Sequence, residues 1–488
     1  MTPLPPRPQI PRIGSFKTVA AFKQHLARLP IPVDCDDAVQ SGPGSPLAQP
    51  LAVAGLRIGN RFAVQPMEGW DGTPEGKPSP LTVRRWRAFG ESGAKLIWGG
   101  EAVAVRPDGR ANPNQLAYTE GNARALGGLL AALRQAHAGR FGTADDLVAG
   151  LQLTHSGRFC RPAPDWGLQP RIAYRHPLLD AQVGVRDDGA LLTDLELGEL
   201  TGAYVAAARC AREAGFQFVD IKHCHGYLLH EFLTAHTRPG PYGGSFENRT
   251  RLLREIVAAI RVDAPGLHIG VRLSAFDFVP FAKPEAAGAP GVPVPHGHLL
   301  PYRYAFGANP DRPVEVDLAE PVAFLELCRA LQIPFVNLTA GSPYTTPHIQ
   351  RPALFPPSDG YLPPEDPLTG CARQLQVAAA LKRAVPELTV VGTGYTYFQD
   401  FLPHVAQAQV RLGRVDLVGL GRMMLSYPHF AADVLAGRAL ERGRVCRTFS
   451  DCTSAPRNRL VSGCYPLDPF YKERPEARRL KAAKKETA

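Results

Sequence analysis

The chain has 488 residues, of which 44% are hydrophobic and 20% charged. This ordinary globular composition excludes general disorder and a fibrous repeat. Lys and Arg number 55 against 45 Asp and Glu, a formal charge of +10, and part of the excess lies in a basic tail around Arg478–Lys485. We interpret this tail as a solvated surface segment and expect no nucleic-acid partner.

Neither the apolar pattern nor the cysteine content suggests a membrane or secreted protein. The sequence contains no apolar run of membrane-spanning length. Prolines interrupt residues 1–16, where a signal peptide needs an apolar stretch. Its nine cysteines are too sparse for a disulfide scaffold. We therefore expect a cytoplasmic enzyme.

Eight short runs that are apolar on both faces recur along the chain, and a helical stretch follows each. The runs are Arg61–Gln65, Lys95–Trp98, Leu147–Leu153, Phe216–Ile221, His268–Leu273, Pro334–Leu338, Leu388–Gly392 and Val415–Leu420. The helical stretches are Leu81–Glu91, Asn122–Ala138, Asp194–Ala214, Glu247–Val262, Pro321–Ala330, Ala372–Ala384, Phe398–Gln409 and Pro428–Leu435. Eight such units predict an α/β fold, the (β/α)8 TIM barrel. A doubly wound sheet is the alternative, but no G-x-G-x-x-G follows the first run.

The barrel is expected to span residues 51–440, with further segments at both ends. Residues 1–50 form a Pro-rich arm with a short helix near Val19–Leu29, predicted to pack over the barrel's bottom or a neighbouring subunit. An insertion at about 276–320, after the fifth strand, is either a lid or a surface excursion. Residues 441–488 form a C-terminal extension with the basic tail.

Polar residues that follow the strands should meet at one mouth of the barrel. The candidates include Met67, Glu68, Gly100, Gln152, Lys222, His225, Tyr227, Arg272, Gly394, Gly421 and Arg422. The last two strands end in glycine-containing turns before a helix, which predicts a phosphate site to which Arg422 adds charge.

The fourth strand is the most informative segment. Alternation puts Phe218, Asp220 and Lys222 on one face, so Lys222 points into the barrel. His225 and Tyr227 follow the strand and can turn back to the same cavity. Together they offer donors for a substrate oxygen and a phenol that can give a proton.

Two other chemistries use the same segment. Lys222 could form a Schiff base with a carbonyl substrate, as in a lyase, if burial lowers its pKa. Asp220, His223, Cys224 and His225 could form a metal site, but alternation sends His223 away from Lys222, so we expect no metal.

The motifs resemble those of the Old Yellow Enzyme family of FMN-dependent oxidoreductases. The resemblance rests on KHCHGYLLHEFL at residues 222–233 and YGGSFENR at residues 242–249. It extends from about Leu51 to Ala436 through GNRFAVQPM, GGEAVAVRPDGR, LQLTHSGR, GVRLS, NLTAGSPY and VGLGRMM.

This resemblance implies a noncovalent FMN. In the family the residue matching Gln152 bonds the flavin pyrimidine, and the one matching Arg272 lies by flavin N1. Those matching Gly394, Gly421 and Arg422 clamp the phosphate, and those matching Pro66 and Met67 lie along the isoalloxazine, with Glu68 and Gly100 nearby.

The resemblance also implies a reaction. NADH or NADPH reduces the flavin, which then passes hydride from N5 to an activated C=C bond in a ping-pong cycle. His225 and Lys222 would hold the substrate's electron-withdrawing group, hydride would go to the β carbon, and Tyr227 would protonate the α carbon. The expected partner is a small molecule with an activated alkene, with no nucleic acid and no membrane, and a homo-oligomer is left open.

Two residues depart from the family pattern. Lys222 replaces the usual His, Asn or Tyr, and Glu68 replaces Thr, Cys or Ala. Because a carboxylate near the flavin opposes its reduction, we expect Lys222 to pair with Glu68. A structural pair of Lys222 with Asp220 is the alternative.

Larger relatives hold a [4Fe-4S] cluster beyond the barrel on four cysteines. The corresponding segment here offers three, Cys446, Cys452 and Cys464, with a wider gap. We therefore expect no iron-sulfur cluster. An amine dehydrogenase or demethylase needs the cluster to accept its electrons. It is therefore the less favoured of the two flavin-dependent functions.

Overall fold

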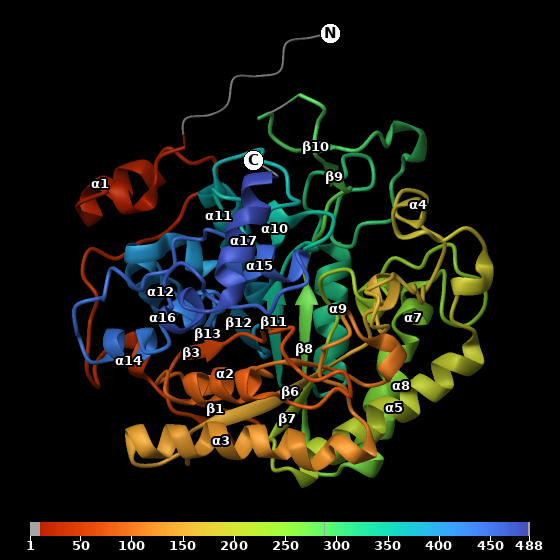
Figure 1. Ribbon diagram of the computed structural model, residues 1–488, viewed down its shortest axis with the longest axis horizontal. Coiled ribbons are helices and arrows are strands. Elements are labelled where there is room, and N and C mark those ends of the chain that lie inside the picture. The colour runs from red at the N-terminus through yellow and green to blue at the C-terminus, as the bar shows by residue number, and fades with distance from the viewer. Residues whose placement is uncertain (1–9, 287, 487–488) are drawn as a thin grey trace.

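The computed structural model describes residues 10–286 and 288–486. Within these residues, eight parallel strands close into a barrel around which the helices pack (Figure 1). In order around the barrel the strands are β3 (Phe62–Val64), β4 (Leu96–Ile97), β6 (Val148–Thr154), β7 (Phe218–Ile221), β8 (His268–Ser274), β11 (Phe335–Thr339), β12 (Thr389–Gly392) and β13 (Leu417–Leu420). The pairings of β13 with β3 and of β4 with β6 complete the ring, so the predicted (β/α)8 barrel is confirmed.

Aromatic side chains fill the barrel interior. Trp98, Phe218 and Phe335 meet edge to face, with ring centroids 4.8 to 5.4 Å apart. Gly150 lies against this group, where an added Cβ would come within 2.3 Å of the Phe218 ring. The bulky rings therefore require a glycine on the neighbouring strand.

The helices follow the predicted order. They are α2 (Pro80–Gly90), α3 (Ala123–Phe141), α5 (Asp194–Glu213), α8 (Arg251–Asp263), α9 (Ala319–Ala330), α11 (Pro367–Ala384), α12 (Leu402–Arg411) and α14 (Phe430–Leu435). Shorter elements between them are β5 (Ala102–Ala104), α4 (Asp180–Val183), α6 (Leu228–Phe232), α7 (Phe246–Arg249), α10 (Pro347–Gln350) and α13 (Met423–Ser426). The predicted helix Glu247–Val262 is divided at Thr250, whose hydroxyl donates to the Phe246 carbonyl at 2.8 Å.

Residues 10–50 of the N-terminal arm do not cover the barrel's bottom, which was one of the two places predicted for the arm. The Phe22 ring of α1 (Val19–Leu26) stacks on Phe401 at 4.3 Å, and Asp36 pairs with Arg411 at 2.7 Å, so residues 10–50 run along α12 and the turn before it. A hairpin that follows, β1 (Leu51–Val53) with β2 (Leu56–Ile58), closes the bottom. Residues 1–9 lie outside the described residues.

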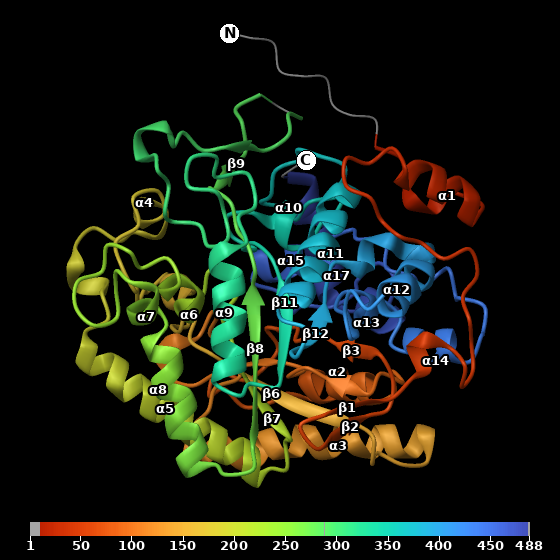
Figure 2. The same cartoon turned by 180° about the vertical axis from the view of Figure 1, so that it is seen from behind.

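Two segments lie beyond the barrel's regular units. The insertion carries a small hairpin, β9 (Phe281–Ala282) with β10 (Val292–Pro293), at the end toward which β8 points (Figures 1 and 2). The C-terminal extension folds into α15 (Asp451–Arg457), α16 (Pro469–Lys472) and α17 (Pro475–Glu486) around its own small core. In the part of the chain that the structure describes, no helix is long and apolar enough to cross a membrane.

Candidate active site

A cavity of about 250 Å³ opens at the carboxyl ends of the barrel strands. Every predicted site residue except Gly100 lines it. These are Pro66, Met67, Glu68, Gln152, Lys222, His225, Tyr227, Arg272, Gly394, Gly421 and Arg422. The barrel topology thus brings together side chains that are more than 350 positions apart in the sequence.

Gly100 lies against Met67 and does not line the cavity, and its cofactor contact stays a prediction. Its carbonyl accepts the backbone N–H of Met67 at 3.2 Å. Its φ is +48°, and an added Cβ would approach the Trp86 ring to 2.9 Å. Gly100 therefore supports Met67 from behind and does not itself line the cavity.

Asp220 organises the floor of the cavity. It accepts from Gln152 Nε2 at 2.6 Å, from the Trp98 indole at 2.8 Å and from the backbone N–H of Arg272 at 2.7 Å. Burial raises the pKa of Asp220, and these donors oppose the rise. The alternative Lys222–Asp220 pair is therefore wrong, and one Gln152 N–H is already engaged.

Lys222 pairs with Glu68, as predicted. Its Nζ lies 3.4 Å from Glu68 Oε1, and the two side chains are 4% and 14% exposed. The same Nζ lies 3.9 Å from the centre of the Tyr227 ring. The ammonium thus contacts both a carboxylate and the face of the phenol.

His225 is held as a neutral imidazole. Burial lowers its pKa well below the usual value, and the charges of Arg272 and Lys222 add to this effect. Its φ is +66°, and its backbone N–H donates to Ser274 Oγ at 2.9 Å. Its Nε2 lies 3.4 Å from Thr339 Oγ1, so the ring faces the cavity with one N–H to donate.

Tyr227 is held as a protonated phenol. Burial raises its pKa well above the usual value, and Glu68 and Tyr344 add to the rise. Its hydroxyl lies 3.2 Å from that of Tyr344. A phenol that keeps its proton is the form that a general acid requires.

The sequence reasoning missed part of the cavity wall. Arg161 follows β6, Tyr344 and Arg351 follow β11, and the C-terminal extension contributes Cys452, Thr453, Pro456, Arg457 and Ser462. Tyr344 and Arg351 could have been suspected because they follow a predicted strand. In the extension, Cys452 drew attention only as a possible cluster ligand, and no motif or spacing marks the other four residues.

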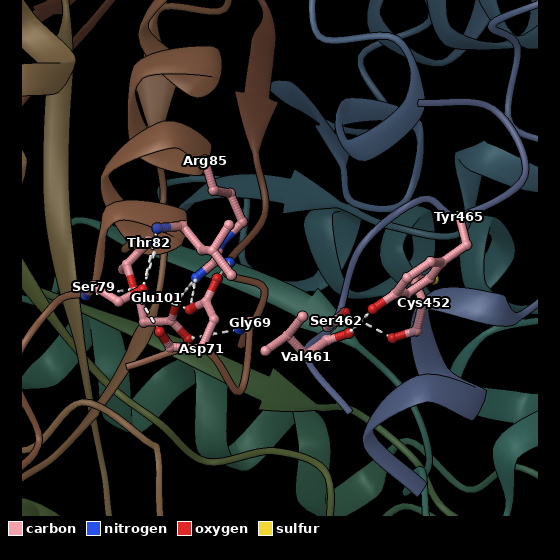
Figure 3. A network of polar contacts seen from close by, with 11 residues as sticks. Gly69, Asp71, Ser79, Thr82, Arg85, Glu101, Cys452, Val461, Ser462 and Tyr465 are labelled. Carbon is pink, nitrogen blue, oxygen red and sulfur yellow. Dashed lines mark hydrogen bonds and ion pairs between the residues drawn. The ribbon is translucent and has the colours of Figure 1, made fainter. Parts of the chain in front are cut away.

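A buried ionic network holds the segment that carries Glu68 and Trp70 (Figure 3). The Arg85 guanidinium binds both Asp71 and Glu101, and Glu101 accepts the Gly69 N–H at 3.2 Å. Burial raises the pKa of Glu101 to about 8, with a further rise from Asp71 and Glu68, while Arg85 opposes it. Two carboxylates facing one guanidinium thus favour a neutral Glu101.

The network also meets the extension. The Ser462 N–H donates to the Gly69 carbonyl at 2.7 Å, and the Ser462 hydroxyl donates to the Cys452 carbonyl at 2.7 Å. The loop after β3 and the C-terminal extension are therefore fixed to one another beside the cavity (Figure 3).

The cavity wall contains polar atoms ready for a ligand. Among the described residues, Arg272 Nε, Arg351 Nε, Arg422 Nη1 and Gln350 Oε1 are buried without a hydrogen-bond partner. Buried polar atoms normally find partners. A ligand with anionic and amide-like groups, which flavin mononucleotide has, would supply them.

The three cysteines of the extension gather near Arg422. Cys446, Cys452 and Cys464 line one small pocket, and burial raises the pKa of Cys464. In the described ranges, no group of three or more His, Cys, Asp or Glu side chains is arranged to hold a metal ion. His223 instead packs on Phe324 in the helix layer, away from Lys222 as alternation predicted.

Comparison with known proteins adds the family. A family model described as NADH:flavin oxidoreductase / NADH oxidase matches residues 46–286. An NADPH dehydrogenase of Halalkalibacterium halodurans is 32% identical over 234 residues, covering 46% of this chain and 62% of that protein. One of a Geobacillus species is 30% identical over 280 residues, covering 52% of this chain and 74% of that protein.

Solved structures share the barrel. A 2-naphthoyl-CoA reductase superposes with a TM-score of 0.64 at 18% identity, over 88% of this chain and 58% of that one. The chain thus spans less than two thirds of some of the proteins it matches. At this identity the likeness shows the fold alone, which is the barrel. The chain belongs to the NADH:flavin oxidoreductase / NADH oxidase family, the Old Yellow Enzyme family that its motifs resemble.

Proposed function

We propose that this protein is an FMN-dependent NAD(P)H oxidoreductase that reduces activated C=C bonds. Family membership supports the flavin and the nicotinamide reductant. The observation that carries the finer assignment is the meeting of Lys222, neutral His225 and protonated Tyr227 in one cavity. Two donors for a substrate oxygen and one proton source are what reduction of an activated alkene requires.

The cavity offers suitable partners for FMN. Arg422 Nη1 has no protein partner in the described chain, and it would hold the phosphate with the turns at Gly394 and Gly421. Arg272, with its Nε also free there, would bind the pyrimidine edge beside Gln152. When bound, FMN would supply hydride transfer between the nicotinamide and the alkene.

The chain's own groups would then bind the substrate and move the proton. The His225 imidazole and the Lys222 ammonium donate hydrogen bonds to the substrate's electron-withdrawing oxygen, where negative charge develops. The Tyr227 hydroxyl gives its proton to the α carbon. Tyr344, 3.2 Å away, is positioned to share the negative charge left on that oxygen.

The cavity's charge weighs against the amine dehydrogenase alternative. Six cationic side chains and one carboxylate line it within the described residues, and that carboxylate is paired with Lys222. Such a cavity repels a protonated amine. The Schiff-base alternative needs Lys222 as a neutral amine. The ammonium would therefore first have to leave its ion pair with Glu68.

Anaerobic half-reactions test the proposal. The purified protein should be yellow, release FMN on denaturation, be bleached by NADH or NADPH, and be reoxidised by enones, enoates or nitroalkenes. A colourless protein that borohydride links to a ketone would support the lyase instead. Stoichiometric iron with acid-labile sulfide would reopen the amine dehydrogenase reading.

A further inference from the structure

The cavity has a strong excess of positive charge. The cations that line it are Arg161, Lys222, Arg272, Arg351, Arg422 and Arg457, and the one carboxylate on its described wall is Glu68. Arg272 and Arg422 serve the proposed flavin, and Lys222 is paired with Glu68. Two of the remaining guanidiniums, Arg161 and Arg457, lie near Tyr344.

Tyr344 places these two arginines at the substrate end. The Arg457 guanidinium lies 5.0 Å from the centre of the Tyr344 ring. Burial raises the pKa of Tyr344, and the nearby charges of Arg457 and Arg161 both oppose that rise. Since the Tyr344 hydroxyl contacts that of Tyr227, both arginines lie near the proposed proton donor.

Neither guanidinium is fully engaged by the protein. Arg161 forms no side-chain hydrogen bond or ion pair with the described residues. Arg457, on α15 of the extension, donates to the Pro343 carbonyl at 2.7 Å. Its ion pair with Asp359 is 3.3 Å long, and Asp359 is 51% exposed. Both arginines therefore keep donors for a ligand.

Mutual repulsion favours an anion here. Burial lowers the pKa of Arg351 to about 10, and the nearby charges of Arg457 and Arg422 add to this effect. A bound anion would offset this repulsion, and guanidinium donors bind a carboxylate or phosphate with paired hydrogen bonds.

We propose that Arg161 and Arg457 form a binding site for an anionic group, a carboxylate or a phosphate, of the molecule that occupies the substrate end. The C-terminal extension thereby selects anionic ligands. This inference rests on the proposed function only in taking the occupant to be the alkene substrate or the nicotinamide.

Binding of matched probes tests the site without relying on turnover. The probes are 4-(3-oxobut-1-enyl)benzoate, an enone whose carboxylate is separate from its activating carbonyl, and the neutral analogue 4-(3-oxobut-1-enyl)benzamide. Both would be titrated into the oxidised holoprotein by calorimetry. The proteins compared would be wild type, Arg161→Gln, Arg457→Gln and the charge-retaining Arg457→Lys. Arg444→Gln, on the extension but outside the cavity and paired with Glu441, controls for net charge. NADH and NADPH would be titrated in parallel under anaerobic conditions.

In either Gln variant, loss of a charge-assisted bond should weaken binding of the benzoate about 10- to 100-fold. Binding of the benzamide should change little, and Arg457→Lys should keep most of the preference for the benzoate. Selective weakening of NADH or NADPH instead would assign the anion to the nicotinamide's phosphates. Equal loss for all probes, or none, would overturn the site. A protein that binds the benzoate as expected but is not bleached by nicotinamide would refute the proposed function alone.

Discussion

Lys222 Nζ lies 3.4 Å from Glu68 Oε1 inside a cavity where other family members are expected to carry neutral residues. The pair places a cation where we propose that the substrate's oxygen binds, together with a carboxylate that would oppose flavin reduction if left alone. Its two roles, substrate binding and charge balance, can be separated.

Replacing Lys222 with His should shift preference from carboxylates toward neutral enones. A charge-assisted hydrogen bond is about twice as strong as a neutral one, so the enoate-to-enone ratio of kcat/KM should fall about tenfold. The ratio would be measured for one enoate and one enone, alongside the flavin midpoint potential. Glu68→Gln, which keeps the ammonium, is the matched control. If the enoate-to-enone ratio is unchanged and the flavin midpoint potential shifts, Lys222 balances the charge of Glu68 and does not bind the substrate.

Replacing Tyr227 with Phe should slow the oxidative half-reaction about 10²- to 10⁴-fold, because the general acid is removed. Flavin reduction by nicotinamide should remain nearly intact, and stopped-flow absorbance resolves the two steps. Tyr344→Phe keeps the Tyr227 phenol and should cost far less. Equal losses in both half-reactions would make Tyr227 a structural residue.

The sequence predicted the barrel well because each strand is a compact local signal. Runs apolar on both faces, such as Phe216–Ile221, need only local patterning to be recognised, and each predicted run overlaps a barrel strand. The arm along α12 was misplaced because its partners, such as Phe401 for Phe22, are almost 400 residues away and follow no periodicity.

The same difference between local patterns and contacts of distant residues applies to the site. Strand-end residues such as Lys222 could be predicted because the barrel topology brings strand ends together. Arg457 could not, because it reaches the cavity from a short helix beyond the barrel units. The insertion after the fifth strand was a candidate lid, yet none of its described residues lines the cavity.

Replacing Gln152 with Leu should weaken FMN binding by about 1–3 kcal/mol, since it leaves a buried partner unsatisfied. Asp220 would keep its bonds from Trp98 and the Arg272 backbone, so the apoprotein should still fold. Fluorescence titration of FMN into apoprotein gives the affinity, and thermal unfolding of the apoprotein controls for folding. Full flavin occupancy with unchanged affinity would argue against a flavin contact at Gln152.

Glu101 should make stability depend on pH. Its pKa, ordinarily 4.5, is raised to about 8 in the folded protein, chiefly by burial. The folded protein therefore binds the proton more tightly, so its stabilising contribution is complete below about pH 4.5 and is lost as the pH rises through 8.

The variant Glu101→Gln tests this, because its side chain is neutral at every pH. Urea unfolding at several pH values would measure the free energy of unfolding of both proteins. The value for wild type relative to the variant should fall between pH 5 and pH 8. Glu213→Gln, at an exposed position on α5, should give a nearly constant difference. A constant difference for Glu101→Gln as well would mean that Arg85 keeps both Asp71 and Glu101 ionised throughout the range.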